Sequence, residues 1–148
     1  EQKIVNNQNL TIDDVLPIAN GQLDLAKKEE SCAKNKHNEV LFFDTTLINT
    51  CMYANMIYAY KSKYLDKLCY LEHYDIYLLT DYIDIKWVSD PGQRSDSDTR
   101  ESQYDQIKNK LEELGRSYHI ISGAFSTRVD QVVKILQQVG LCPPLNPK

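Results

Sequence analysis

The sequence predicts an α/β fold in which a parallel sheet forms the middle of three layers and helices cover both of its faces. Three short runs, at residues 39–44, 74–80 and 118–123, are almost entirely apolar. Between them, apolar residues recur at helical intervals. Strands that alternate with helices along a chain are typical of a parallel sheet buried on both faces. With 148 residues, the chain has the size of one domain.

The first half of the chain is expected to form three helices and two strands. Thr11 and Asp14 have the spacing of a capping box, and the apolar residues after them follow the helical period. The expected elements are a helix that begins near residue 12, a strand at 39–44, helices at about 47–60 and 62–72, and a strand at 74–80.

The second half begins with a polar segment, at about residues 81–98, that is longer than most connections between elements. We expect this segment to be functional or mobile, and residues 81–100 form a candidate lid. The expected elements after it are a helix at about 99–115 that stops at Gly115, a strand at 118–123, and a closing helix with an apolar stripe from Val129 to Val139.

The composition is that of a soluble globular protein, with 42% hydrophobic and 26% charged residues. A net charge of -4 argues against a general nucleic-acid binder, which usually carries a basic face. No apolar run approaches the roughly 18 residues that cross a bilayer, and the polar beginning of the chain does not resemble a signal peptide. The sequence therefore predicts a cytoplasmic protein without nucleic-acid or membrane partners.

The four cysteines show no spacing of a metal site. Because a cytosolic protein keeps its thiols reduced, we expect free thiols rather than a disulfide framework. The three histidines are scattered and lack the spacing of metal ligands.

Asp44 ends the run VLFFDTT, in which a buried strand would bring a carboxylate to the edge of the sheet. Ligands of parallel sheets bind at the carboxyl ends of the strands, where Asp44, Thr80 and Ser122 are expected. In phosphoryl-transfer enzymes such an acid meets Mg²⁺ or a substrate hydroxyl. The spacing alone supports equally well a helix N-cap at Asp44, Thr45 or Thr46.

The segment WVSDPGQRS, residues 87–95, is a second candidate site. It contains Trp87, the only tryptophan, and Arg94, and Arg100 follows shortly after it. Tryptophan offers a stacking face and arginine a planar charged fork for phosphate oxygens, so such a loop can close over a ligand. Composition by itself favours a simpler interpretation, in which the tryptophan fills the core and the arginines pair with nearby aspartates.

A phosphate-binding loop of the form GxxxxGK[ST] is not found in the 148 residues. The five glycines stand at positions 21, 92, 115, 123 and 140, and none of them is followed by Lys-Ser or Lys-Thr. These residues therefore cannot build the usual cradle of backbone N–H groups around the phosphates of ATP.

Five stretches, in the same order, resemble the ribosylnicotinamide kinase domain of the NadR-type proteins, a branch of the P-loop kinases and AAA-like ATPases. The resemblance covers residues 13–136. The stretches are IANGQLDLAKKE, LFFDTTLINT (similar to the family's FxDTDxxxT), YDIYLLT, WVSDPGQRS (similar to its W-V-D-D-G-x-R-S lid) and SYHIISGAFSTRVDQVVKIL.

The resemblance implies a reaction and a role for each candidate residue. The γ-phosphoryl group of ATP would pass to the 5′-hydroxyl of nicotinamide riboside, with Mg²⁺ as cofactor. Asp44 would position Mg²⁺, directly or through water, or the acceptor hydroxyl. Trp87 would stack on the nicotinamide ring, and Asp90 would bind substrate or order the lid. Arg94, and less surely Arg100, would bind the ATP phosphates and stabilise charge during transfer.

The sequence departs from the family pattern in the substrate-binding segments. Thr46, the third expected substrate-binding residue, stands where the family usually has a second Asp, so the identity of the riboside is open. Ser89 replaces the first acid of the lid, and Pro91 is inserted.

Family members also carry a strand, the phosphate loop, a helix and usually a further strand ahead of the region that corresponds to Glu1, and such a unit takes roughly 30 residues or more. We therefore expect residues 1–148 to be the C-terminal major part of one kinase-like domain, incomplete at its N-terminus and unable to bind ATP alone. The absent strand would lie between those that end at Asp44 and Thr80. Two other interpretations are another nucleoside or nucleotide kinase of this fold, and a non-catalytic regulatory or interaction module.

Overall fold

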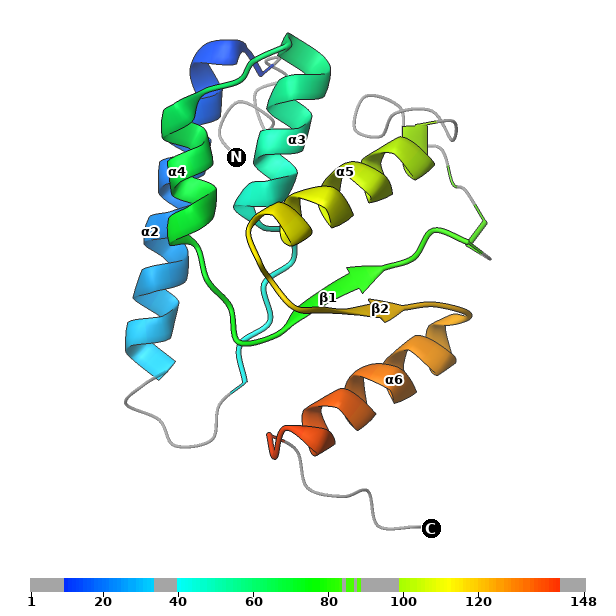
Figure 1. Ribbon diagram of the computed structural model, residues 1–148. Helices are drawn as coiled ribbons and strands as arrows, with labels where there is room; N and C mark the ends of the chain where they lie inside the picture. Colours follow the sequence, from blue (N-terminus) through cyan, green and yellow to red (C-terminus); the bar gives the residue numbers. More distant parts are fainter. Residues whose placement is uncertain (1–9, 34–39, 84, 87, 89–98, 142–148) are drawn as a thin grey trace, which may run out of the picture. The chain divides into compact units, whose positions relative to one another are not determined.

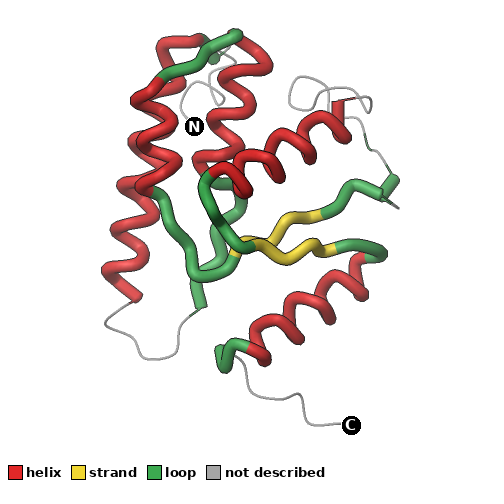
Figure 2. The backbone as a smooth tube through the Cα atoms, viewed as in Figure 1, coloured by secondary structure: helices red, strands yellow, loops and turns green. Residues whose placement is uncertain are grey.

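The computed structural model describes residues 10–33, 40–83, 85–86, 88 and 99–141 (Figure 1). The chain divides into two compact units, Glu1–His73 and Tyr74–Lys148, which are described one at a time. In the described residues the first unit is helical, and the second holds both strands (Figure 2).

The first unit is built from three helices, α2 (Val15–Ala33), α3 (Leu47–Tyr58) and α4 (Lys63–Leu71), each of which contacts the other two. A short 3-10 helix, η1 (Ile12–Asp14), precedes α2 and begins with the expected capping box, because the Thr11 backbone N–H donates to the Asp14 carboxylate. The core consists of small and branched apolar side chains: Val15, Ala19, Leu23, Leu47, Ile48, Met52, Ala54, Leu65, Leu68 and Cys69.

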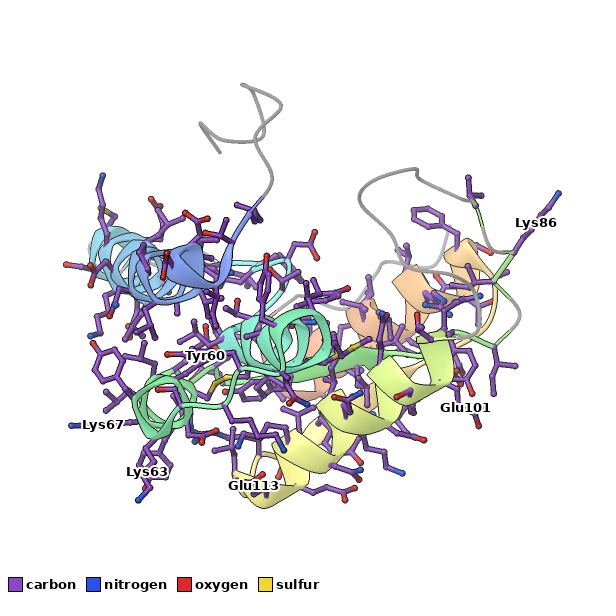
Figure 3. The ribbon with its side chains drawn as sticks, turned by 90° about the horizontal axis from the view of Figure 1, so that it is seen from above. Tyr60, Lys63, Lys67, Lys86, Glu101 and Glu113 are labelled. Atoms are coloured by element: carbon purple, nitrogen blue, oxygen red, sulfur yellow. A yellow bond between two sulfur atoms is a disulfide. The ribbon has the colours of Figure 1, made fainter. Side chains whose placement is uncertain are left out.

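The helices of the first unit are also joined by polar contacts. The Thr50 hydroxyl of α3 donates to Gln22 Oε1 of α2 over 2.6 Å, and the Tyr64 hydroxyl of α4 donates to Asn20 Oδ1 of α2 over 3.0 Å. On the opposite side of α4, Lys63 and Lys67 point away from the other two helices (Figure 3). The helix is therefore amphipathic, with its apolar side on the core.

The structure joins Cys51 of α3 and Cys69 of α4 by a disulfide. The expectation that all the cysteines are free thiols is therefore wrong for this pair. Cys32, near the end of α2, is free and exposed.

The strand expected at residues 39–44 is not formed at residues 40–44, the part of it that the structure describes. Leu41 and Phe42 are 38% and 67% exposed, so this apolar run is not buried as expected. A strand needs a neighbour to pair its N–H and C=O groups, and the described residues of the first unit supply no strand. The apolar composition of the run alone cannot replace those hydrogen bonds.

The second unit contains strands β1 (Tyr77–Thr80) and β2 (Tyr118–Ile121), which pair in parallel with Tyr77 opposite Tyr118. The connection between them contains helix α5 (Arg100–Glu113), and α6 (Phe125–Gln138) follows β2. Both strands fall within the expected runs and are shorter than expected. Parallel strands joined through a helix form the βαβ unit that alternation predicted.

Helices α5 and α6 lie on opposite sides of the two-stranded sheet (Figures 1 and 3). The buried core of this unit is formed by Tyr77, Leu79, Leu111 and Ile121. Ile120 is 49% exposed, so β2 is not covered at every residue. The full three-layer sheet predicted from the sequence is not confirmed, because only two strands are found in the described residues.

The end of α5 follows from the conformational freedom of glycine. Gly115, just beyond α5, has φ of +64°, a left-handed conformation that glycine adopts without steric cost, and it ends the helix as predicted. Within the described residues, no helix has the length and apolar character that a bilayer crossing requires.

Candidate functional site

Asp44 lies on an exposed bend directly before α3. In the described part of the chain, no residue forms a hydrogen bond or ion pair with its carboxylate. An exposed, unpaired carboxylate can bind a cation or accept a proton from a ligand hydroxyl. The predicted position of Asp44 at the end of a buried strand is wrong, but its side chain is accessible.

The residue after Asp44 has an unusual backbone. Thr45 has φ of +71°, in the left-handed region that β-branched residues rarely adopt. Such a conformation costs on the order of 1–3 kcal/mol and persists only where the surrounding structure fixes it. Strained residues of this kind cluster at active sites and ligand-binding loops, so the conformation of Thr45 marks this corner as a candidate site.

Thr46 is the N-cap of α3, so the capping role that the sequence left open belongs to Thr46 and not to Asp44. The Thr46 hydroxyl accepts from Ile48 N over 3.2 Å, and Thr46 N donates to Asn49 Oδ1 over 2.9 Å. These reciprocal bonds form a capping box and fix the first turn of the helix. Since the Thr46 hydroxyl is engaged in the cap, a contact with substrate would have to share it.

A buried carboxylate supports the same turn. Glu72, at the C-terminal end of α4, accepts from Leu47 N over 2.8 Å and is only 5% exposed. The sequence reasoning missed Glu72, because it stands 25 residues from its partner and in no recognisable motif. We define the D-T-T corner as Asp44, Thr45 and Thr46.

In the second unit, the polar segments after β1 and β2 are bound to each other. Asp81 N donates to Ile121 O over 2.8 Å, which extends the pairing of the strands beyond Thr80. Ser122 exchanges two hydrogen bonds with the Gln131 side chain, which fixes the end of β2 against α6. The structure thus brings together the ends of β1 and β2, which are two of the three strand ends at which ligand-binding side chains were expected.

Arg128 of α6 joins these two loops. Its Nε donates to Gly123 O over 2.7 Å, and its Nη2 donates to Asp81 O over 2.6 Å. The guanidinium group thus bridges segments that lie far apart in sequence. This role of Arg128 could not be predicted from the sequence, because a helical pattern does not show that one arginine turns back onto the end of the preceding strand.

Three residues of the predicted lid, Trp87, Asp90 and Arg94, lie outside the described residues. Arg100, at the start of α5, is described. Its Nη2 donates to Tyr82 O over 2.8 Å, and its Nη1 donates to Ile85 O over 3.0 Å. Arg100 therefore holds the start of the candidate lid, and a phosphate contact would require it to exchange these carbonyl acceptors.

The ring of Tyr82 contacts both Arg100 and Tyr104. The Arg100 guanidinium lies 5.6 Å from the centre of the Tyr82 ring, and the Tyr104 ring meets Tyr82 edge-on at 5.6 Å. Burial raises the pKa of Tyr82, and the carboxylates of Glu101, Asp105 and Asp81 add to this effect. The raised pKa widens the pH range over which the Tyr82 phenol stays neutral, as an ordinary tyrosine already is at physiological pH.

Asp44 belongs to the first unit, and Arg100 and Arg128 belong to the second. Among the residues that the structure describes, no three His, Cys, Asp or Glu side chains form a metal-binding cluster. Mg²⁺ in phosphate-transfer sites is usually bound by one or two carboxylates together with water and substrate phosphates. A single accessible acid such as Asp44 fits that donor set.

A family model described as an AAA domain matches residues 1–128. Since the match covers most of the chain, the protein belongs to this AAA domain family, which is P-loop NTPase-like and nucleotide-binding. No curated protein and no solved structure gave a significant match to the chain.

Proposed function

We propose that this chain is part of a kinase that uses ATP and Mg²⁺ to phosphorylate the 5′-hydroxyl of nicotinamide riboside, giving the mononucleotide. Membership of a nucleotide-binding AAA family supports the use of a nucleoside triphosphate. The motifs LFFDTTLINT and WVSDPGQRS, which resemble those of ribosylnicotinamide kinases, support the acceptor.

The observation that carries the proposal is the exposure of the Asp44 side chain together with the conformation of the two residues that follow it. Its carboxylate is exposed on a corner that is strained at Thr45 and fixed by the capping box at Thr46. A carboxylate that served only the helix would accept from the first turn, and Thr46 already does so. The strain is explained if the corner must present an acid in one orientation.

In the proposed reaction Asp44 orients the acceptor hydroxyl and can take its proton as the phosphoryl group arrives. Asp44 would help to hold Mg²⁺, directly or through water, and the ion would supply positive charge for the phosphate groups. Trp87 would stack on the nicotinamide ring, Asp90 would bind the riboside or order the lid, and Arg94 would bind phosphate. Holding the reactants in line then supplies most of the rate.

The test is a phosphorylation assay on the full-length protein with a panel of nucleosides, using ATP and Mg²⁺. We expect nicotinamide riboside to be the preferred acceptor, and Asp44→Asn to lower kcat by about 100-fold or more, as the loss of a positioned acid–base group does. The matched control is Asp24→Asn on an exposed position of α2, which should leave kcat unchanged. Equal activity of the two variants would refute the role of Asp44.

A second candidate function is a nucleotide-binding-fold module with a regulatory or interaction role. The absence of GxxxxGK[ST] from the 148 residues favours it. The residues encoded immediately before Glu1 separate the two candidates. A phosphate loop there supports the kinase, and a sequence without one supports the module.

A further inference from the structure

The N-terminus of α3 requires an acceptor that the local sequence does not supply. The first N–H groups of a helix have no partner within the helix. Ile48 N is bound by the Thr46 hydroxyl, and Asn49 N is bound by Thr46 O. Leu47 N remains, and because Leu47 is 0% exposed, water cannot reach it. Its acceptor is Glu72 Oε2, at 2.8 Å.

Glu72 reaches this position from a rigid element. It is the C-cap of α4, and its own N–H donates to Leu68 O over 3.0 Å, so its backbone is fixed by the helix. Burying a carboxylate is costly unless donors or positive charge compensate for it. The N-terminus of α3 provides both, a backbone N–H and the positive end of the helix dipole. A capping bond alone needs no charge, since a glutamine could accept it.

The bond formed by Glu72 lies beside the strained residue. Only Thr45 and Thr46 separate Asp44 from Leu47. The unfavourable φ of Thr45 could relax if the chain ahead of α3 were free to swing. Glu72 at Leu47 N and Asn49 at Thr46 N oppose that relaxation by fixing the two residues that follow Thr45.

We propose that Glu72 is a positioning residue for Asp44: it holds the D-T-T corner in its strained form and so sets the orientation of the Asp44 carboxylate. The role in catalysis rests on the proposed function of Asp44. The mechanical part, that Glu72 fixes the corner, does not depend on what Asp44 binds.

The experiment compares Glu72→Ala, Glu72→Gln and a matched control in the full-length protein. Ser62→Ala is the control, because Ser62 caps α4 through Tyr64 N and its loss removes a helix cap without touching the D-T-T corner. Two properties are measured: hydrogen exchange at the amides of residues 45–48, and the kinetics of phosphorylation, as kcat and the KM values for nicotinamide riboside and for ATP.

We expect Glu72→Ala to speed exchange at Leu47 by at least about 10-fold and to lower kcat by roughly 10- to 100-fold at an unchanged KM for ATP. Ser62→Ala should change neither. Glu72→Gln, which keeps an acceptor, should recover most of the exchange protection and most of kcat. If Glu72→Ala does not fold, Glu72→Asp, which shortens the arm by one carbon, should change the same two properties.

Unchanged exchange at Leu47 in Glu72→Ala, or a loss of kcat in that variant no larger than in Ser62→Ala, would overturn the proposal. An assay of the wild-type protein separates failure of the proposed function from failure of the role proposed for Glu72. If it phosphorylates no nucleoside, exchange at residues 45–48 and the amide chemical shifts of Asp44 and Thr45 still decide whether Glu72 fixes the corner.

Discussion

At the scale of single residues, Thr45 has a backbone angle that a β-branched side chain rarely adopts. A threonine at φ of +71° opposes the folding of the corner, and the bonds around it compensate. In the proposal that Glu72 positions Asp44, this arrangement holds the carboxylate in one direction, which a relaxed loop would not do. Strain of this kind is tolerated when the geometry serves a site.

Replacing the strained threonine should therefore stabilise the protein. Asparagine adopts the left-handed region more readily than a β-branched residue, so we expect Thr45→Asn to raise the free energy of unfolding by about 1 kcal/mol. Urea unfolding followed by circular dichroism measures the difference. Thr11→Asn is the control, because Thr11 is an N-cap with an ordinary φ of -124° and asparagine caps equally well. Equal stability changes in the two variants would contradict the assignment of strain to Thr45.

At the scale of elements, α3 and α4 of the first unit are joined by three kinds of contact. They share the apolar core of the first unit, the bond from Leu47 N to Glu72, and the disulfide between Cys51 and Cys69. These contacts lie along the same helix pair that carries the D-T-T corner. A change in the packing of α4 is thus expected to alter the position of Asp44.

The disulfide can be tested by alkylation and peptide mass spectrometry. Without reductant, iodoacetamide should modify the exposed Cys32 but not Cys51 or Cys69, even in denaturant. After reduction all three should react. In the Cys51→Ser variant, Cys69 should be modified in denaturant without any reductant. Modification of Cys51 and Cys69 in the unreduced, denatured wild-type protein would show that the bond is not formed.

In the second unit the elements are linked through arginines at the carboxyl ends of the strands. Arg128 joins the loops after β1 and β2, and Arg100 holds the segment after Asp81. Both guanidinium groups donate to backbone carbonyls, so they order the chain rather than depend on particular side chains. The first residues of the candidate lid are therefore held in place by hydrogen bonds.

For the chain as a whole, the missing feature is the phosphate loop. Residues 1–148 contain no GxxxxGK[ST], and without backbone N–H groups around the phosphates we expect no measurable ATP binding by this chain alone. Isothermal titration with Mg-ATP tests this, and a longer version of the protein that includes such a loop, if one is encoded, serves as the positive control. Tight binding by residues 1–148 would contradict the expectation.

Much of the secondary structure could be predicted because its signals are local. The stop at Gly115, the capping box at Thr11 and the apolar runs of β1 and β2 each depend on neighbouring residues. The run at residues 39–44 has the same composition as a strand, and the prediction failed there because strand formation depends on a partner. Composition carries no information about whether that partner is present.

The amino-acid sequence by itself determined which segments can form helices, that the runs at residues 74–80 and 118–123 can form strands of a parallel sheet, and that Asp44 precedes a helix. Only the tertiary structure decided that Thr46 caps that helix, that Thr45 is strained, and that Glu72, Arg128 and the Cys51–Cys69 pair hold the loops and helices. These contacts join residues 25, 47 and 18 positions apart. Such contacts arise from chain packing, which no local pattern of residue types encodes.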